Sequence, residues 1–125
     1  MESEERTFRA LVVDDDEEDR TRVSGVLKNE GFDVFEARNG REALERIRKN
    51  NFALIVLDIL MPYVDGFEVM SHLKKQLPEA LEKTVVASCV DLRDLNAFFP
   101  SCRVIQKPVS TSDLAQIARD ITKSA

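Results

Sequence analysis

The sequence predicts an α/β fold in which an open parallel sheet is covered by helices on both faces. Along the 125 residues, five apolar segments of strand length alternate with five segments of helical periodicity, as in a chain of βα units. The apolar run Leu54–Leu57 has no alternating polar residue, which is typical of a parallel strand buried on both faces. A chain of this length is too short for an eight-fold barrel, so the open sheet remains.

The five predicted strands are short, and four of them lead into residues that can carry chemistry. The first runs into three acids, Asp14–Asp16, and the third runs into Asp58. The fourth ends at Ser88, and the fifth is followed directly by Lys107. An acid, a hydroxyl or an ammonium group is therefore expected at the carboxyl end of each of these strands. The expected strand bounds are Phe8–Val13, Asp33–Ala37, Ala53–Leu57, Thr84–Ser88 and Arg103–Gln106.

The predicted helices have apolar residues at helical spacing and recognisable terminal signals. Gly31 follows the first helix as a C-terminal cap, and Asn39–Gly40 leads into the second. Pro78 marks the end of the third helix, and Ser110 with Asp113 resembles a capping box before the last. The expected helix bounds are Glu17–Glu30, Arg41–Lys49, Gly66–Leu77, Leu92–Phe99 and Ser112–Lys123.

The order of the strands decides which of their carboxyl ends meet. Right-handed crossovers leave few topologies for five βα units, and the flavodoxin-like order 2-1-3-4-5 is the expected one. This arrangement is a (βα)5 three-layer sandwich in which strands 1 and 3 are neighbours. Asp14, Asp15 and Asp58 should therefore lie together at the switch point of the sheet, where ligands bind in such folds.

Composition excludes several classes of function. The 23 acidic residues outnumber the 18 Lys and Arg, giving a net charge of −5, and the sequence offers no basic face for nucleic acid. No apolar run approaches the roughly 20 residues that cross a bilayer, and the N-terminus lacks the pattern of a secretory signal. A cytoplasmic location is expected, in which Cys89 and Cys102 are free thiols.

The predicted acidic pocket suggests phosphoryl chemistry on a metal-binding carboxylate. Crowded carboxylates repel one another unless they share a proton or a cation, and oxygen ligands without His or Cys favour Mg²⁺. A carboxylate such as Asp58 can then act as a nucleophile and form an acyl phosphate. Lys107 would neutralise charge on the phosphoryl group, and the hydroxyl of Ser88 would donate a hydrogen bond to it. The acids Asp16–Asp19, in contrast, are interpreted as an ordinary first turn of a helix.

The motifs, taken in order, resemble the receiver domain of two-component response regulators. They are VVDDD, LDILMPYVDG, a strand that ends in Ser88, and QKP. The resemblance covers about residues 7–122 and implies a single receiver domain over residues 1–125. It also implies a signalling switch rather than a turnover enzyme, because the pocket would catalyse only its own phosphorylation and dephosphorylation.

The resemblance assigns a role to each residue of the pocket. Asp58 would accept the phosphoryl group from a phosphohistidine on a histidine kinase or a phosphotransfer protein. Asp15, Asp58 and the backbone carbonyl of Leu60 would ligate Mg²⁺, with Asp14 nearby, directly or through water. Ser88 and Lys107 would contact the phosphoryl group. The expected downstream partner is a protein or an output domain, and a dimer linked to phosphorylation is a further expectation. Whether the chain acts alone or belongs to a longer regulator stays open.

Three departures from the family pattern keep an alternative open. Val104 stands where the family often has an aromatic switch residue, and Cys89 replaces the commoner Ala or Gly after the hydroxyl residue. The segment from Ser88 to Lys107 also looks about one helical turn shorter than usual. The alternative is a receiver fold that acts as an interaction module without phosphorylation. A true phosphohydrolase is disfavoured, because Leu60 occupies the position of the required general acid.

The flanking residues predict a long-lived acyl phosphate. In the family, the side chains two positions after the acceptor and two after the hydroxyl residue influence hydrolysis, and here they are Leu60 and Val90. Neither can orient an attacking water, so we expect slow decay of the phosphorylated protein in a time course. A polar substitution at Leu60 should accelerate the decay. Loss within seconds that does not respond to this substitution would contradict the prediction.

Overall fold

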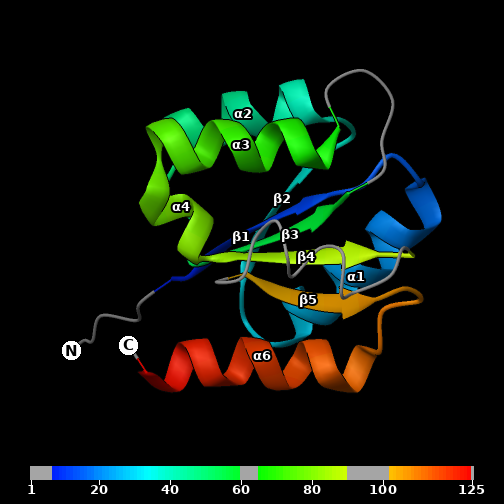
Figure 1. The fold of residues 1–125 in the computed structure, drawn as a ribbon. Coiled ribbons are helices and arrows are strands. Elements are labelled where there is room, and N and C mark those ends of the chain that lie inside the picture. The colour runs from blue at the N-terminus through cyan, green and yellow to red at the C-terminus, as the bar shows by residue number, and fades with distance from the viewer. Residues whose placement is uncertain (1–6, 60–64, 90–101, 125) are drawn as a thin grey trace.

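A five-stranded parallel sheet forms the centre of the protein (Figure 1). The structure, a computed structural model, describes residues 7–59, 65–89 and 102–124. The strand order β2-β1-β3-β4-β5 confirms the predicted flavodoxin-like topology. The elements, in chain order, are β1 (Arg9–Val13), α1 (Glu17–Asn29), β2 (Asp33–Ala37), α2 (Gly40–Lys49), β3 (Leu54–Asp58), α3 (Gly66–Gln76), α4 (Pro78–Glu82), β4 (Thr84–Ser88), β5 (Arg103–Gln106) and α6 (Thr111–Ser124).

Helices on both faces of the sheet complete three layers. Figure 1 shows α2 and α3 together on one face and α6 on the other, where α1 packs beside it. Successive side chains of a strand point to opposite faces, so β1 sends Leu11 and Val13 into one core and Ala10 and Val12 into the other. Both faces of the central strands are therefore covered, and every residue of β3 and β4 is buried.

The helix termini follow the signals in the sequence. The Asn39 side chain accepts a hydrogen bond from the N–H of Glu42 at the start of α2, and Ser110 Oγ accepts one from the N–H of Asp113 at the start of α6. At the end of α1, Gly31 has a φ of 92°, the left-handed conformation that a glycine adopts without strain. These caps satisfy backbone groups that the helices leave unpaired.

Several predicted bounds differ from those of the structure. β1 starts, α1 ends and α2 starts one residue away from the predicted position, and α6 is one residue longer at each end. β3 begins at Leu54 rather than Ala53 and extends through Asp58, so the carboxylate belongs to the strand itself. α3 ends at Gln76, and Pro78 starts the additional short helix α4, because proline is well tolerated in the first turn of a helix. A five-residue helix has too little periodicity to be recognised in the sequence. The helix expected over Leu92–Phe99 lies outside the described residues.

Two other features agree with the sequence. Cys89, beyond the end of β4, is exposed, and Cys102, just before β5, is buried; both are free thiols. Burial raises the pKa of the Cys102 thiol, which favours its neutral form. Within the described ranges, none of the helices combines the length and the apolar character that a bilayer crossing requires.

Substitution by alanine should change the free energy of unfolding in opposite directions at Gly25, within α1, and at Gly31, in its C-terminal cap. Neither a Cβ on Gly25 nor one on Gly31 would meet another atom within 4 Å, so backbone conformation alone decides the result. Gly25→Ala should raise the free energy of unfolding by about 0.5–1 kcal/mol, because alanine favours the helix interior. Gly31→Ala should lower it by about 1–2 kcal/mol, because of the positive φ. Urea unfolding of both variants tests this pair, and equal signs would contradict it.

Candidate functional site

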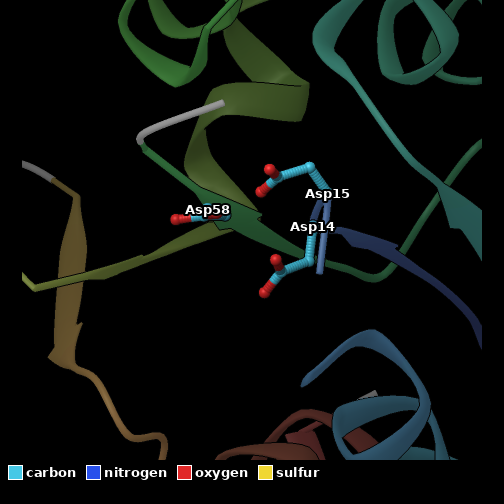
Figure 2. Close-up of side chains that lie close together, drawn as sticks. All are labelled: Asp14, Asp15 and Asp58. Carbon is cyan, nitrogen blue, oxygen red and sulfur yellow. The ribbon is translucent and has the colours of Figure 1, made fainter. Parts of the chain in front are cut away.

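Three aspartates come together at the carboxyl edge of the sheet. β1 and β3 are paired in register, with Val13 opposite Leu57, so Asp14 and Asp58 end adjacent strands. Carboxylate oxygens of Asp14, Asp15 and Asp58 lie within 4.8 Å of one another, and Figure 2 shows the three side chains gathered at the ends of these strands. Asp14 and Asp58 are only 5% and 6% exposed, whereas Asp15 is exposed. The expected convergence of these acids is therefore present.

The backbone around Asp14 is fixed by hydrogen bonds on every side. Its N–H donates to the carbonyl of Ala37 over 3.1 Å, and its side chain accepts from the N–H of Asp16 over 3.0 Å. Its carbonyl accepts a 2.9 Å hydrogen bond from Arg20 Nη1. The same guanidinium forms a 2.9 Å ion pair with Glu36. The turn that carries Asp14 and Asp15 is thus held by both neighbouring elements, α1 and β2.

Lys107 reaches the acidic cluster from the end of β5. Its N–H donates to the carbonyl of Ser88 over 2.9 Å, which extends the β4–β5 pairing by one step, and its bond to Pro108 is cis. Its Nζ lies 3.0 Å from Asp14 Oδ2 and 3.5 Å from Asp58 Oδ2. The side chain is 14% exposed. The ammonium group therefore occupies the same edge of the sheet as the aspartates.

The charge on Lys107 is secured by these acids. Burial alone would lower the pKa of Lys107, but the hydrogen bond to Asp14 and the negative charges of Asp58, Asp14 and Asp19 together raise it above its ordinary value. Because the pKa is raised, the amine stays protonated at every pH below the ordinary lysine pKa and also at pH values somewhat above it. Lys107 is consequently a permanent cation of the site at neutral pH.

Ser88 lies at the end of β4, beside this cluster. It is fully buried and pairs in register with Gln106, the residue before Lys107. The preceding carbonyl, that of Ala87, accepts a hydrogen bond from the N–H of Ile59 over 3.2 Å. The ends of β3, β4 and β5 are therefore tied together. Leu60 and Val90 lie outside the described residues, so the metal-ligand role of the Leu60 carbonyl stays a prediction.

Gly66 permits α3 to start directly against the end of β3. Its N–H donates to the carbonyl of Ile59 over 2.9 Å. A Cβ at this position would lie 2.5 Å from Ile59 Cα and 2.6 Å from the carbonyl oxygen of Asp58. The glycine of the motif LDILMPYVDG is therefore required by the close approach of two backbones beside Asp58.

Two residues of the site were not recognised in the sequence. Arg20 was not assigned any role, and Asp19 was interpreted only as part of a helix start. Asp16 caps α1, in agreement with the interpretation of this run as a helix start. Asp19 Oδ2, however, also lies 3.5 Å from Lys107 Nζ. The pairing of Arg20 with Glu36, across 16 residues, offers no spacing signal that separates it from ordinary surface charges.

The donor atoms of the cluster suit a hard cation. The three aspartates supply carboxylate oxygens only, and Lys107 offsets one of their charges. The remaining negative charge can hold a divalent ion, and oxygen ligands without nitrogen or sulfur favour Mg²⁺. The acidic cluster thus meets the chemical requirement for the expected metal.

Comparison with known proteins agrees with this geometry. A family model described as the response regulator receiver domain matches residues 10–119. The transcriptional regulatory protein SrrA of Staphylococcus aureus (strain NCTC 8325 / PS 47) is 41% identical over 70 residues, which are 54% of this chain and 29% of SrrA. The match therefore spans less than a third of the length of that curated relative.

Two solved structures are similar over nearly the whole chain. The receiver domain of Francisella response regulator 1452 superposes with a TM-score of 0.81 at 27% identity, covering 94% of this chain and 98% of that one. The response regulator TrrA of Thermotoga maritima, solved in complex with Mg²⁺–BeF, gives a TM-score of 0.78 at 27% identity, covering 92% and 99%. The chain belongs to the family of response regulator receiver domains, as its motifs indicated.

Substitution of Gly66 should disturb the end of β3 directly. Gly66→Ala places a methyl group against backbone atoms of Asp58 and Ile59, which cannot move aside as a flexible side chain would. Overpacking of this kind costs about 1–3 kcal/mol, so we expect a loss of that size in the free energy of unfolding measured in urea. Gly25→Ala, in open space, is the matched control. An unchanged stability of Gly66→Ala would contradict the backbone contact.

Proposed function

We propose that this receiver domain is a phosphorylation-controlled signalling switch in which Asp58 accepts the phosphoryl group. The donor is a phosphohistidine on a histidine kinase or on a phosphotransfer protein. The observation that supports this proposal is the meeting of Lys107 Nζ with the oxygens of Asp14 and Asp58, beside the exposed Asp15. A purely structural role would not require a buried carboxylate at each of two adjacent strand ends.

The proposed reaction is an in-line transfer between the donor histidine and Asp58. A carboxylate oxygen of Asp58 forms a bond to phosphorus as the bond from phosphorus to the histidine nitrogen breaks. The electron pair of the broken bond stays on the imidazole nitrogen, and the product on this chain is an aspartyl phosphate. The low exposure of Asp58 limits the access of water to that product.

The other residues of the site would manage charge during the transfer. Asp15, Asp58 and the carbonyl of Leu60 would hold Mg²⁺, with Asp14 as a direct or water-mediated ligand. When bound, the ion supplies positive charge that lets an anionic phosphoryl group approach an anionic pocket. Lys107 would pair with a phosphoryl oxygen from the β5 side, and Ser88 would donate a hydrogen bond from β4. Fixed donors of this kind need no rearrangement when charge develops.

The consequence of phosphorylation would be a change in what this chain binds. The downstream target is a protein partner or an output domain, and a phosphorylation-linked dimer is one form that such a change can take. The relative SrrA is a transcriptional regulatory protein. The acidic balance of this chain favours protein contacts over direct nucleic-acid binding, and a cytoplasmic location fits a kinase partner.

One observation favours the alternative of a phosphorylation-independent interaction module. Val104, at the position of the family's usual aromatic, is packed against the core on the α2–α3 side and cannot report phosphorylation by rotation of a ring. The convergence of Asp14, Asp15, Asp58 and Lys107 argues against this alternative, because an interaction module has no need of it.

Incubation with acetyl phosphate and Mg²⁺ should separate the two functions. Intact-mass spectrometry should show the addition of one phosphoryl group to the wild-type protein and none to Asp58→Asn, because the amide is not a nucleophile. Removal of Mg²⁺ with a chelator should abolish the modification, and beryllofluoride should bind only when Mg²⁺ is present.

The exposed acid Asp33, at the start of β2, offers a matched control. Asp33→Asn removes the same charge at the opposite edge of the sheet and should be modified like the wild type. A wild-type protein that remains unmodified, or an Asp58→Asn variant that is modified equally, would overturn the proposed function.

A further inference from the structure

Lys107 has a third acidic neighbour that the proposed reaction does not use. Asp19, in the first turn of α1, places Oδ2 3.5 Å from Lys107 Nζ, the same distance as that of Asp58 Oδ2. Asp19 is 37% exposed, whereas Asp58 is almost buried. The ammonium group therefore lies between one carboxylate on α1 and the carboxylates at the strand ends.

Asp19 also pairs with a second cation, Arg22, which lies on α1 like Asp19 itself. Its Oδ1 lies 3.9 Å from Arg22 Nη2, and Arg22 Nη1 donates a 2.9 Å hydrogen bond to the carbonyl of Val109. Val109 follows Lys107 by two residues. α1 thus contacts the segment after β5 both through the lysine side chain and through the backbone beyond it.

Asp19 stands apart from the carboxylates that can share a metal ion. That set consists of Asp14, Asp15 and Asp58. A divalent cation among those three would compensate their charge and weaken their attraction for Lys107. Among the ion pairs of Lys107 with described residues, the pair with Asp19 involves a carboxylate outside that set. Asp19 would therefore keep its attraction for the ammonium group while the metal is bound.

Lys107 does not need Asp19 in order to stay in the site. The lysine is held by the 3.0 Å hydrogen bond from Nζ to Asp14 and by its N–H on the carbonyl of Ser88. Removal of the Asp19 charge would therefore leave Lys107 in the site. It would also remove a carboxylate that competes with the phosphoryl group for the ammonium group.

We propose that Asp19 is a positioning residue that draws Lys107 toward α1 and thereby restrains the transfer of a phosphoryl group to Asp58. The proposal rests on the proposed function of Asp58, which it extends by one regulatory contact. In this arrangement the rate of phosphoryl transfer to Asp58 is lower than the strand-end residues alone would permit, and a cation that pairs with Asp19 would release the restraint.

The test compares rates of modification by acetyl phosphate at saturating Mg²⁺ as the donor concentration is varied. Asp19→Asn should be modified about two- to fivefold faster than the wild type, the range expected for a partly exposed ion pair. Asp19→Glu should retain the wild-type rate, because it restores the charge. Glu18→Gln, in the same exposed helix turn, removes an equal charge away from Lys107 and should leave the rate unchanged.

A second measurement examines the contact without any phosphodonor. Urea unfolding of Asp19→Asn, Lys107→Met and the double variant should give non-additive shifts, because the two side chains interact. Additive shifts, or a rate of Asp19→Asn equal to or below that of the wild type, would overturn the inference. An acceleration of equal size in Glu18→Gln would also overturn it. An unmodified wild type would instead overturn the function of Asp58 and, with it, this extension.

Discussion

The repulsion among carboxylates at the ends of β1 and β3 is the constraint around which the site is built. Parallel pairing of these two strands brings Asp14 and Asp58 to the same edge with little exposure to water, where like charges interact strongly. Two cations counter this repulsion: Lys107, which follows β5, lies 3.0 Å from Asp14 Oδ2, and Arg20 of α1 donates a hydrogen bond to the carbonyl of Asp14. The two cations come from different elements, and the aspartate oxygens themselves suit a divalent ion.

Residues at strand ends were predictable, because the rule that places them is simple. An unbroken apolar run predicts a buried parallel strand, and the carboxyl ends of parallel strands share one edge. These two rules place Asp14, Asp15, Asp58 and Lys107 at one edge of the sheet, where the structure has them. The end of β3 was wrong by one residue because a charged side chain suggested that the strand had already ended at Leu57, whereas Asp58 continues the ladder.

Residues that act from helices were harder to predict. The contacts of Asp19 and Arg20 depend on the rotation of α1 relative to the ends of β1, β2 and β5, and this rotation is set by packing on the sheet. In the sequence, both residues belong to a run of charges that a solvated helix start would also contain. α4 was missed for a different reason, since its five residues span little more than one turn.

The hydrogen bond between Asp14 and Lys107 joins residues that are 93 positions apart. Because a chain is synthesised from its N-terminus, the aspartates at the ends of β1 and β3 leave the ribosome before Lys107, and until then they have no counter-charge from it. The full set of charges at this edge of the sheet therefore assembles only when β5 pairs with β4. A chain that ended before β5 would keep the three aspartates but would lack the cation that lies 3.0 Å from Asp14.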